Sequence, residues 1–276
     1  MKFVTKAAAT VETGLSYLGS VNTNAKLKKN GKVSQQHTYG LYLAPASLSG
    51  YNVCSHSTPE CRMGCLHASG HTAMEILSGG NRIQNARIKK TQLLIEHPDF
   101  FMKWLVSEIE TKRITAIKKG FGFSVRLNCT SDIDWVNIKL YGQNIFEIFP
   151  NVQFYDYTKN PNKFVNKPKN YHLTFSYTGR NWSACKTVLE RGFNIAMVFN
   201  VKNEKLIPAM YNGFNVVNGD LTDYRVNDAK GVIIGLKWKR IANKENEAKV
   251  LNSCFVVNPE CTNVRQYETA KTAVEK

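Results

Sequence analysis

Three of the seven cysteines lie close together in the chain. Cys54, Cys61 and Cys65 fall within the segment NVCSHSTPECRMGCLHASG at 52–70, with the spacing C-x6-C-x3-C, and the other four are widely spread. Thiolates are the ligands of iron–sulfur clusters, and three of them on one loop can each bind one iron of a four-iron cluster. One iron would then remain without a cysteine. The spacing therefore favours a cluster with an open iron.

Two other interpretations of this loop remain open. Because the loop is rich in histidine, the three cysteines could bind zinc with His56, His67 or His71 as the fourth ligand. The cysteines could also be three reduced thiols without a metal. A disulfide framework is not expected, because the number of cysteines is odd and the chain shows no export signal.

A second group of polar residues follows an expected strand. Arg126, Asn128, Ser131 and Asp132 lie at its end and in the loop behind it, where they are expected to line a cavity that faces the open iron and to bind a ligand. An arginine can hold a carboxylate with two parallel hydrogen bonds. The alternative is that the asparagine and aspartate side chains form turns and helix caps. The segment at 154–157 (FYDY) ends another strand, where a Tyr or Asp could also contact a ligand or simply pack.

The elements that must position these residues alternate along the chain. Several expected strands are near-continuous apolar runs, which is typical of parallel strands covered on both faces. Helices lie between many of them, so the predicted fold is α/β, an open or partial (β/α) barrel. Ligands of such folds gather in loops beyond the carboxyl ends of the strands. The expected strands are 39–43, 121–127, 152–157, 171–177, 194–201, 214–217 and 231–238, and the expected helices are 81–96, 99–119, 135–149 and 181–191.

The chain of 276 residues is expected to form one domain over 1–242 and a peripheral tail over 243–276. Within the domain, 1–37 is expected to be a weakly ordered lead-in. No apolar run approaches the roughly 20 residues of a membrane span, and the N-terminus lacks a signal-peptide core. We therefore expect a soluble, unexported protein without a membrane partner.

Charge is the most pronounced bulk property. Lys and Arg number 37 against 21 Asp and Glu, which gives a net charge of +16. Such an excess suits a nucleic acid or another polyanion as a partner. The basic residues are dispersed rather than gathered in one stripe, so the charge could equally serve solubility.

Three segments carry a resemblance to a known family: LAPASLSGYNVCSHSTPECRMGCLHASG, VRLNCTSDIDW and VVNGDLTDYRVNDAKGVIIGLK. Together they resemble the bacteriophage gene product 88 family over about 39–239. Members look like distant relatives of radical S-adenosylmethionine (SAM) enzymes. The resemblance implies a [4Fe–4S] cluster held by Cys54, Cys61 and Cys65 in a barrel resembling the radical SAM core. It also implies SAM or another small ligand at the open iron, and a site of action in the cytoplasm of the infected bacterial host.

The chain also departs from the radical SAM pattern. Those enzymes usually show C-x3-C-x2-C and a Gly-Gly-Glu segment, and this chain has neither. The resemblance thus implies a cofactor more than a reaction. The departures favour a second hypothesis, a non-catalytic iron–sulfur protein that transfers electrons or stabilises its own fold. A third hypothesis is a zinc-stapled nucleic-acid-binding module.

Overall fold

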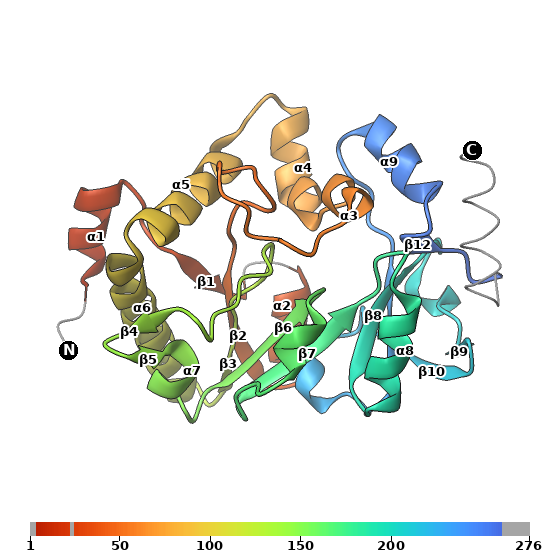
Figure 1. Cartoon of the computed structure of the whole chain (residues 1–276). Coiled ribbons are helices and arrows are strands. Elements are labelled where there is room, and N and C mark those ends of the chain that lie inside the picture. The colour runs from red at the N-terminus through yellow and green to blue at the C-terminus, as the bar shows by residue number, and fades with distance from the viewer. Residues whose placement is uncertain (1–3, 23–24, 261–276) are drawn as a thin grey trace.

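The computed structural model describes residues 4–22 and 25–260, and it is a mixed α/β structure built around one large sheet (Figure 1). The strands of that sheet are β1 (Gly19–Val21), β2 (Gln36–Leu41), β3 (Gly122–Arg126), β6 (Gln153–Thr158), β7 (Tyr171–Ser176), β8 (Asn194–Phe199), β9 (Met210–Tyr211), β10 (Phe214–Asn218), β11 (Ile233–Lys237) and β12 (Val256–Val257). The helices are α1 (Lys6–Thr13), α2 (Ala25–Val33), α3 (Pro59–Met63), α4 (Gly70–Leu77), α5 (Arg82–Glu96), α6 (Pro98–Lys118), α7 (Ile145–Ile148), α8 (Trp182–Glu190) and α9 (Lys244–Leu251).

The sheet is mostly parallel and open. Its strand order is β1-β2-β3-β6-β7-β8-β11-β10-β9, with β12 paired to β8. The central strands from β2 to β10 all run parallel, and only the edge strands β1 and β9 are antiparallel to their neighbours. The α/β class expected from the sequence is confirmed. The carboxyl ends of the parallel strands lie at one edge of the sheet, which we call the carboxyl edge.

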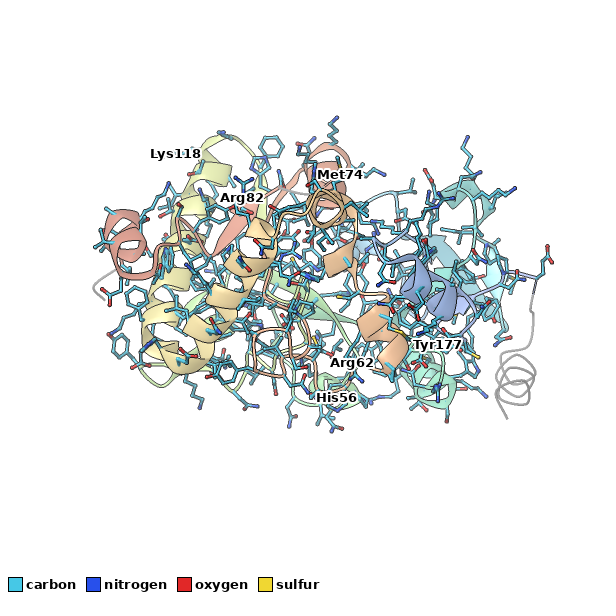
Figure 2. All side chains as sticks on the ribbon, turned by 90° about the horizontal axis from the view of Figure 1, so that it is seen from above. His56, Arg62, Met74, Arg82, Lys118 and Tyr177 are labelled. Atoms are coloured by element: carbon cyan, nitrogen blue, oxygen red, sulfur yellow. The ribbon has the colours of Figure 1, made fainter. Side chains whose placement is uncertain are left out.

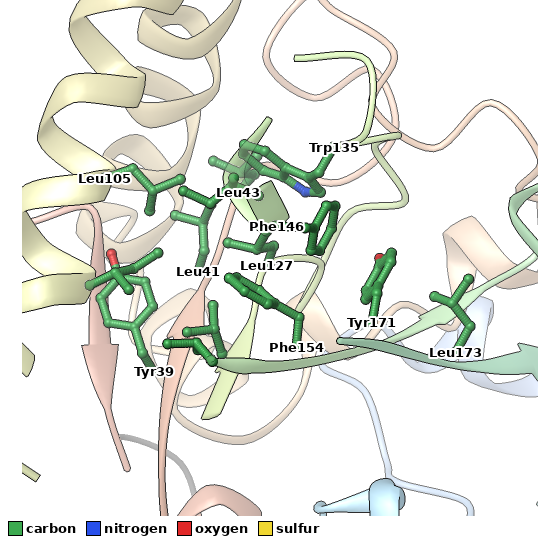
Figure 3. Packing of buried hydrophobic residues seen from close by; sticks show 14 of the residues in the cluster. Tyr39, Leu41, Leu43, Leu105, Leu127, Trp135, Phe146, Phe154, Tyr171 and Leu173 are labelled. Carbon is green, nitrogen blue, oxygen red and sulfur yellow. The ribbon is translucent and has the colours of Figure 1, made fainter. Parts of the chain in front are cut away.

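One face of the sheet, the outer face, carries the main hydrophobic core (Figure 3). Alternate strand residues point to this face, among them Tyr39, Val125 and Phe154, all fully buried. Helix α6 packs on β2 and β3 and contributes Trp104, while α8 packs on β7 and β8. The apolar runs of the sequence therefore place the strands under a helical layer, and burial of these side chains supplies most of the stability.

The opposite, inner face of the sheet is polar and is covered by α2 and by the loop after β10. Asn30 of α2 is fully buried and joins the helix to the sheet and to the loop after β10. Its Nδ2 donates to Thr38 Oγ1 (2.9 Å) and to the hydroxyl of Tyr155 (3.1 Å) on the sheet. Its Oδ1 accepts from Thr222 Oγ1 (2.8 Å) and from the backbone N of Asp223 (2.8 Å) in the loop. One amide thus fixes both covers of the inner face.

The N-terminal segment differs from expectation. The sequence predicted a weakly ordered lead-in over 1–37, whereas the structure forms α1, β1 and α2 there. The reason lies far along the chain. Lys26 of α2 forms an ion pair with Asp220 (2.9 Å), and Lys29 Nζ donates to the carbonyl of the same residue (2.8 Å). Local sequence shows no such long-range partner.

The expected helix at 135–149 is also wrong. Only the short α7 is helical, and a hairpin of β4 (Lys139–Leu140) and β5 (Gln143–Asn144) precedes it. Tyr141 (φ 51°) and Gly142 (φ 83°) form the two-residue turn. Positive φ at both central positions is typical of tight hairpins. Glycine supplies this conformation readily, which explains why the chain turns back instead of continuing a helix.

The C-terminal segment adds to the domain. The expected tail over 243–276 contributes α9, which packs on α3, and β12, whose Val256 pairs with Val198 of β8. Residues 261–276, with Cys261, lie outside the described part of the chain. The expected helices 81–96 and 181–191 are confirmed as α5 and α8, and Gly192 (φ 79°) follows the end of α8. In the described residues, no helix has the length and apolarity needed to cross a bilayer.

Replacing Asn30 with alanine should destabilise the protein by about 3 kcal/mol, because several buried donors and acceptors on the sheet and the loop lose their partner at once. Urea denaturation measures this change. The matched control is Asn162→Ala at an exposed position, for which we expect a change within about 0.5 kcal/mol. Equal stabilities of the two variants would show that Asn30 does not hold the covers of the inner face in place.

Candidate functional site

The cysteine loop follows β2 and lies over the carboxyl edge, together with α3 and α4 (Figure 1). Figure 2 looks down on this side, with His56 of the loop and Arg62 of α3 labelled. The loop after β3 is tied to the same region. Thr130 Oγ1 donates to the carbonyl of Leu43 (2.6 Å), and the backbone N of Asp132 donates to the carbonyl of Val53 (2.8 Å). Two loops from neighbouring parallel strands thus form one layer above the sheet.

The local sequence shapes the turn between the cysteines. Thr58 caps α3, because its Oγ1 accepts from the backbone N of Cys61 (3.2 Å), and Pro59 occupies the first turn. The helix ends at Gly64, and Cys65 follows directly. A Cβ at Gly64 would lie 3.1 Å from the ring of Trp238, so a larger residue would push α3 away from the C-terminal segment. Cys61 and Cys65 are thereby held at the two ends of one short turn.

The three thiols are close neighbours. Burial raises the pKa of Cys54, and the charge of Cys61 raises it further. Burial also raises the pKa of Cys65, to about 11, with added contributions from Cys61 and Cys54. Cys54 and Cys65 are therefore protonated at neutral pH. Metal ligation requires thiolates and therefore releases protons, so binding of a cluster here should tighten as pH rises.

A half-buried cation lies beside the thiols. Lys159 follows β6, and its ammonium group lies near enough to Cys61, Asp132 and Cys54 to feel their charges. Burial alone would lower the pKa of Lys159, but these three groups together raise it. The lysine stays charged and can offset the negative charge of metal-bound thiolates. Sequence analysis did not predict this residue, because nothing local marks one lysine among 37 Lys and Arg.

Asp132 joins the cysteine layer to the next strand. Its Oδ1 accepts from Lys163 Nζ (2.7 Å) and from Thr158 Oγ1 (2.8 Å), and its Oδ2 accepts from the backbone N of Lys159 (2.8 Å). The Asp132 and Lys163 side chains are only 9% and 4% exposed. This buried pair therefore positions the segment that carries Lys159, and its carboxylate is fully engaged within the protein.

Asn128 and Ser131 are also engaged internally. Asn128 Oδ1 accepts from Ser131 Oγ (2.9 Å), from the backbone N of Ile133 (2.9 Å) and from Trp135 Nε1 (3.2 Å). Its Nδ2 donates to the carbonyl of Ile133 (3.0 Å). These bonds are those of the turn-forming alternative considered from the sequence. Ligand binding by Asn128, Ser131 and Asp132 stays a prediction, and each would have to exchange an internal hydrogen bond for it.

Arg126 is the predicted ligand-binding residue that keeps a spare donor. Its Nη1 forms a hydrogen-bonded ion pair with Asp223 (2.9 Å). Its guanidinium lies over the ring of Tyr157, 4.7 Å from the centroid. Its Nε is 4.0 Å from Asp156 Oδ1 and, among the described residues, has no hydrogen-bond partner. The residues around Arg126 come from β6 and from the loop after β10, far apart in sequence.

His67 fits a zinc site poorly. His67 is buried, and its Nδ1 accepts from Arg87 Nη1 (2.9 Å), since an arginine only donates. The neutral ring then carries its proton on Nε2, which leaves neither nitrogen free to bind a metal. Burial lowers the pKa of His67 to about 4, and the charge of Arg87 adds to the shift. Over the described residues, no three His, Cys, Asp or Glu side chains are grouped closely enough to hold a single metal ion.

A comparison with family models supplies the wider context. The model described as gene product 88 matches residues 18–253. The chain belongs to the gene product 88 family. The matched range contains all three loop cysteines, Asp132 and Lys159, and it extends through α9. This is a family of phage gene products. Neither the curated proteins nor the solved structures contain a match to the chain.

The Asp132–Lys163 pair gives a test of how the site is held. Asp132→Asn should lower the free energy of unfolding by about 3–5 kcal/mol, because it leaves the buried ammonium of Lys163 without a counter-charge. The control is Asp134→Asn, since Asp134 bonds only to Val136 and Asn137 close by in the chain. Chemical denaturation of both variants measures the difference. An Asp132→Asn variant as stable as the control would show that the Asp132–Lys163 pair does not hold this region in place.

Proposed function

We propose that the protein binds a [4Fe–4S] cluster through Cys54, Cys61 and Cys65. The observation that carries the proposal is the gathering of the three thiols over the carboxyl edge, beside the half-buried cation Lys159. In a four-iron cluster each thiolate binds a different iron, so the thiolates surround a centre wider than one ion. Such a centre is compatible with thiols that are neighbours but do not converge on a single point. The cluster would supply one-electron chemistry.

The position of the loop supports a ligand at the open iron. In α/β folds small molecules bind beyond the carboxyl ends of the strands, where this loop lies. The open parallel sheet agrees with a partial barrel of the radical SAM type, and SAM or another small ligand would complete the fourth iron. Arg126 lies at the carboxyl end of β3 with a spare donor for such a ligand.

A second candidate is a non-catalytic iron–sulfur protein that transfers electrons or uses the cluster to stabilise its fold. The internal hydrogen bonds of Asn128, Ser131 and Asp132 favour it, because they leave few polar groups for a substrate. Calorimetric titration of SAM into the reduced protein separates the two candidates. Binding supports the first, and its absence supports the second.

The setting of the protein is also part of the proposal. Cys54, Cys61, Cys65 and Cys129 are free thiols, which agrees with a reducing compartment. We infer that this phage protein acts in the cytoplasm of the infected bacterial host. The net charge of +16 supports a nucleic acid or another polyanion as an additional partner.

Anaerobic reconstitution with iron and sulfide tests the cluster. The wild-type protein should become brown, absorb broadly near ~400 nm and retain about four irons per chain. Cys61→Ser should lose the absorption and the iron because it lacks one of three ligands. The matched control is Cys185→Ala, which alters a buried cysteine of α8 and should keep the cluster. A colourless wild-type protein with about one zinc per chain would refute the proposal.

A further inference from the structure

Several buried polar atoms on the inner face lack a hydrogen-bond partner among the described residues. They are Arg126 Nε, Tyr157 OH, His172 Nε2 and Thr174 Oγ1. The sheet places them together. Tyr157 of β6 pairs with Thr174 of β7 in parallel register, so both side chains point to the same face. His172 lies two residues before Thr174, and the guanidinium of Arg126 covers the ring of Tyr157. The unpaired atoms thus lie on the same face of three adjacent strands.

Such a group is unusual in a folded protein. More than nine in ten buried polar groups have a partner, and an unsatisfied one costs about 1–3 kcal/mol. Scattered single cases are common, but several unpaired atoms on one patch of sheet indicate that a bound molecule supplies the missing bonds. Arg126 Nε, Tyr157 OH and Thr174 Oγ1 can all donate. Their common partner would therefore be rich in acceptor oxygens.

The charges around the group point in the same direction. Arg225 is near enough to Tyr157 to interact with it electrostatically. Its Nη1 lies 3.2 Å from Asp228 Oδ2, but the angles of this contact are not those of a hydrogen bond. Burial raises the pKa of Asp156, to about 7, and also that of Asp228. Burial would raise the pKa of Asp223 too, but Arg126 and other cations hold it below its usual value. The guanidinium groups of Arg126 and Arg225 thus lie among carboxylates, and burial disfavours the charged form of Asp156 and Asp228. A bound anion there would interact favourably with both guanidinium groups.

We propose that the inner face binds a small oxyanion through Arg126 Nε, Tyr157 OH and Thr174 Oγ1. The anion is a carboxylate or phosphate group, either as a free ion or as part of a larger molecule. The site lies on the face of the sheet and includes no residue of the cysteine loop. Arg126 Nε carries a single N–H, so an anion bound here takes the donor that is offered above to a ligand of the open iron, and the two roles of Arg126 are alternatives.

The test uses the full-length protein with inorganic phosphate and with acetate as separate probes. Thermal unfolding and calorimetry measure binding by the wild-type protein and by Tyr157→Phe and Thr174→Val, each of which removes one donor with little change in shape. We expect at least one anion to raise the melting temperature of the wild-type protein, because a ligand that binds only the folded state stabilises it. Binding should weaken about tenfold or more in both variants. Tyr141→Phe, at an exposed hairpin position, is the matched control and should bind like the wild type.

The two probes also distinguish the source of the anion, since binding of only one of them identifies a phosphate or a carboxylate. The inference is overturned if neither anion binds, or if Tyr157→Phe and Thr174→Val bind as tightly as the wild type. If, in addition, both variants are more stable than the wild type, the unpaired hydroxyl groups are buried without any ligand. Should Tyr157→Phe fail to fold, Thr174→Val alone decides between these outcomes.

Discussion

The parallel course of the central strands is the constraint on which the site depends. Because the strands from β2 to β10 run in the same direction, the loops that follow β2, β3 and β6 must all emerge at the carboxyl edge. The first brings the three cysteines, the second brings Asp132, and the third brings Lys159. Residues more than 100 positions apart in sequence become neighbours for this reason alone. An antiparallel arrangement would place alternate loops at opposite edges and separate the thiols from the cation.

The two faces of the sheet have different roles, since the outer face stabilises the fold and the inner face carries polar groups. The outer face is apolar and holds the helices, so it fixes the strands in register. The inner face carries hydroxyl, amide and guanidinium groups, and only a small apolar cluster around Ala196, Val232 and Ile234 interrupts them. A buried polar face is costly unless its groups are paired. Asn30 and the Arg126–Asp223 ion pair satisfy part of it, and the remainder is the part we assign to a bound anion.

The sequence predicted the features that depend on local pattern. Apolar runs identified the parallel strands, and the spacing of the cysteines identified the loop at their carboxyl ends. Contacts between distant segments were not predictable in the same way. The ordered α2 depends on Asp220, almost 200 residues away, and Arg126 pairs with Asp223, which lies 97 residues away. The hairpin at 139–144 was mistaken for a helix because periodicity cannot detect the positive φ of Tyr141 and Gly142. The role of Lys159 depends on the thiols that the fold places beside it.

The central claim is that three cysteines hold a four-iron cluster over the carboxyl edge. The most direct measurement is a crystal structure of the anaerobically reconstituted protein, with anomalous scattering recorded on both sides of the iron absorption edge. The account predicts iron density in contact with the Sγ atoms of Cys54, Cys61 and Cys65, with one iron that no cysteine reaches. A single zinc ion at the three thiols, or metal-free thiols after reconstitution, would contradict it.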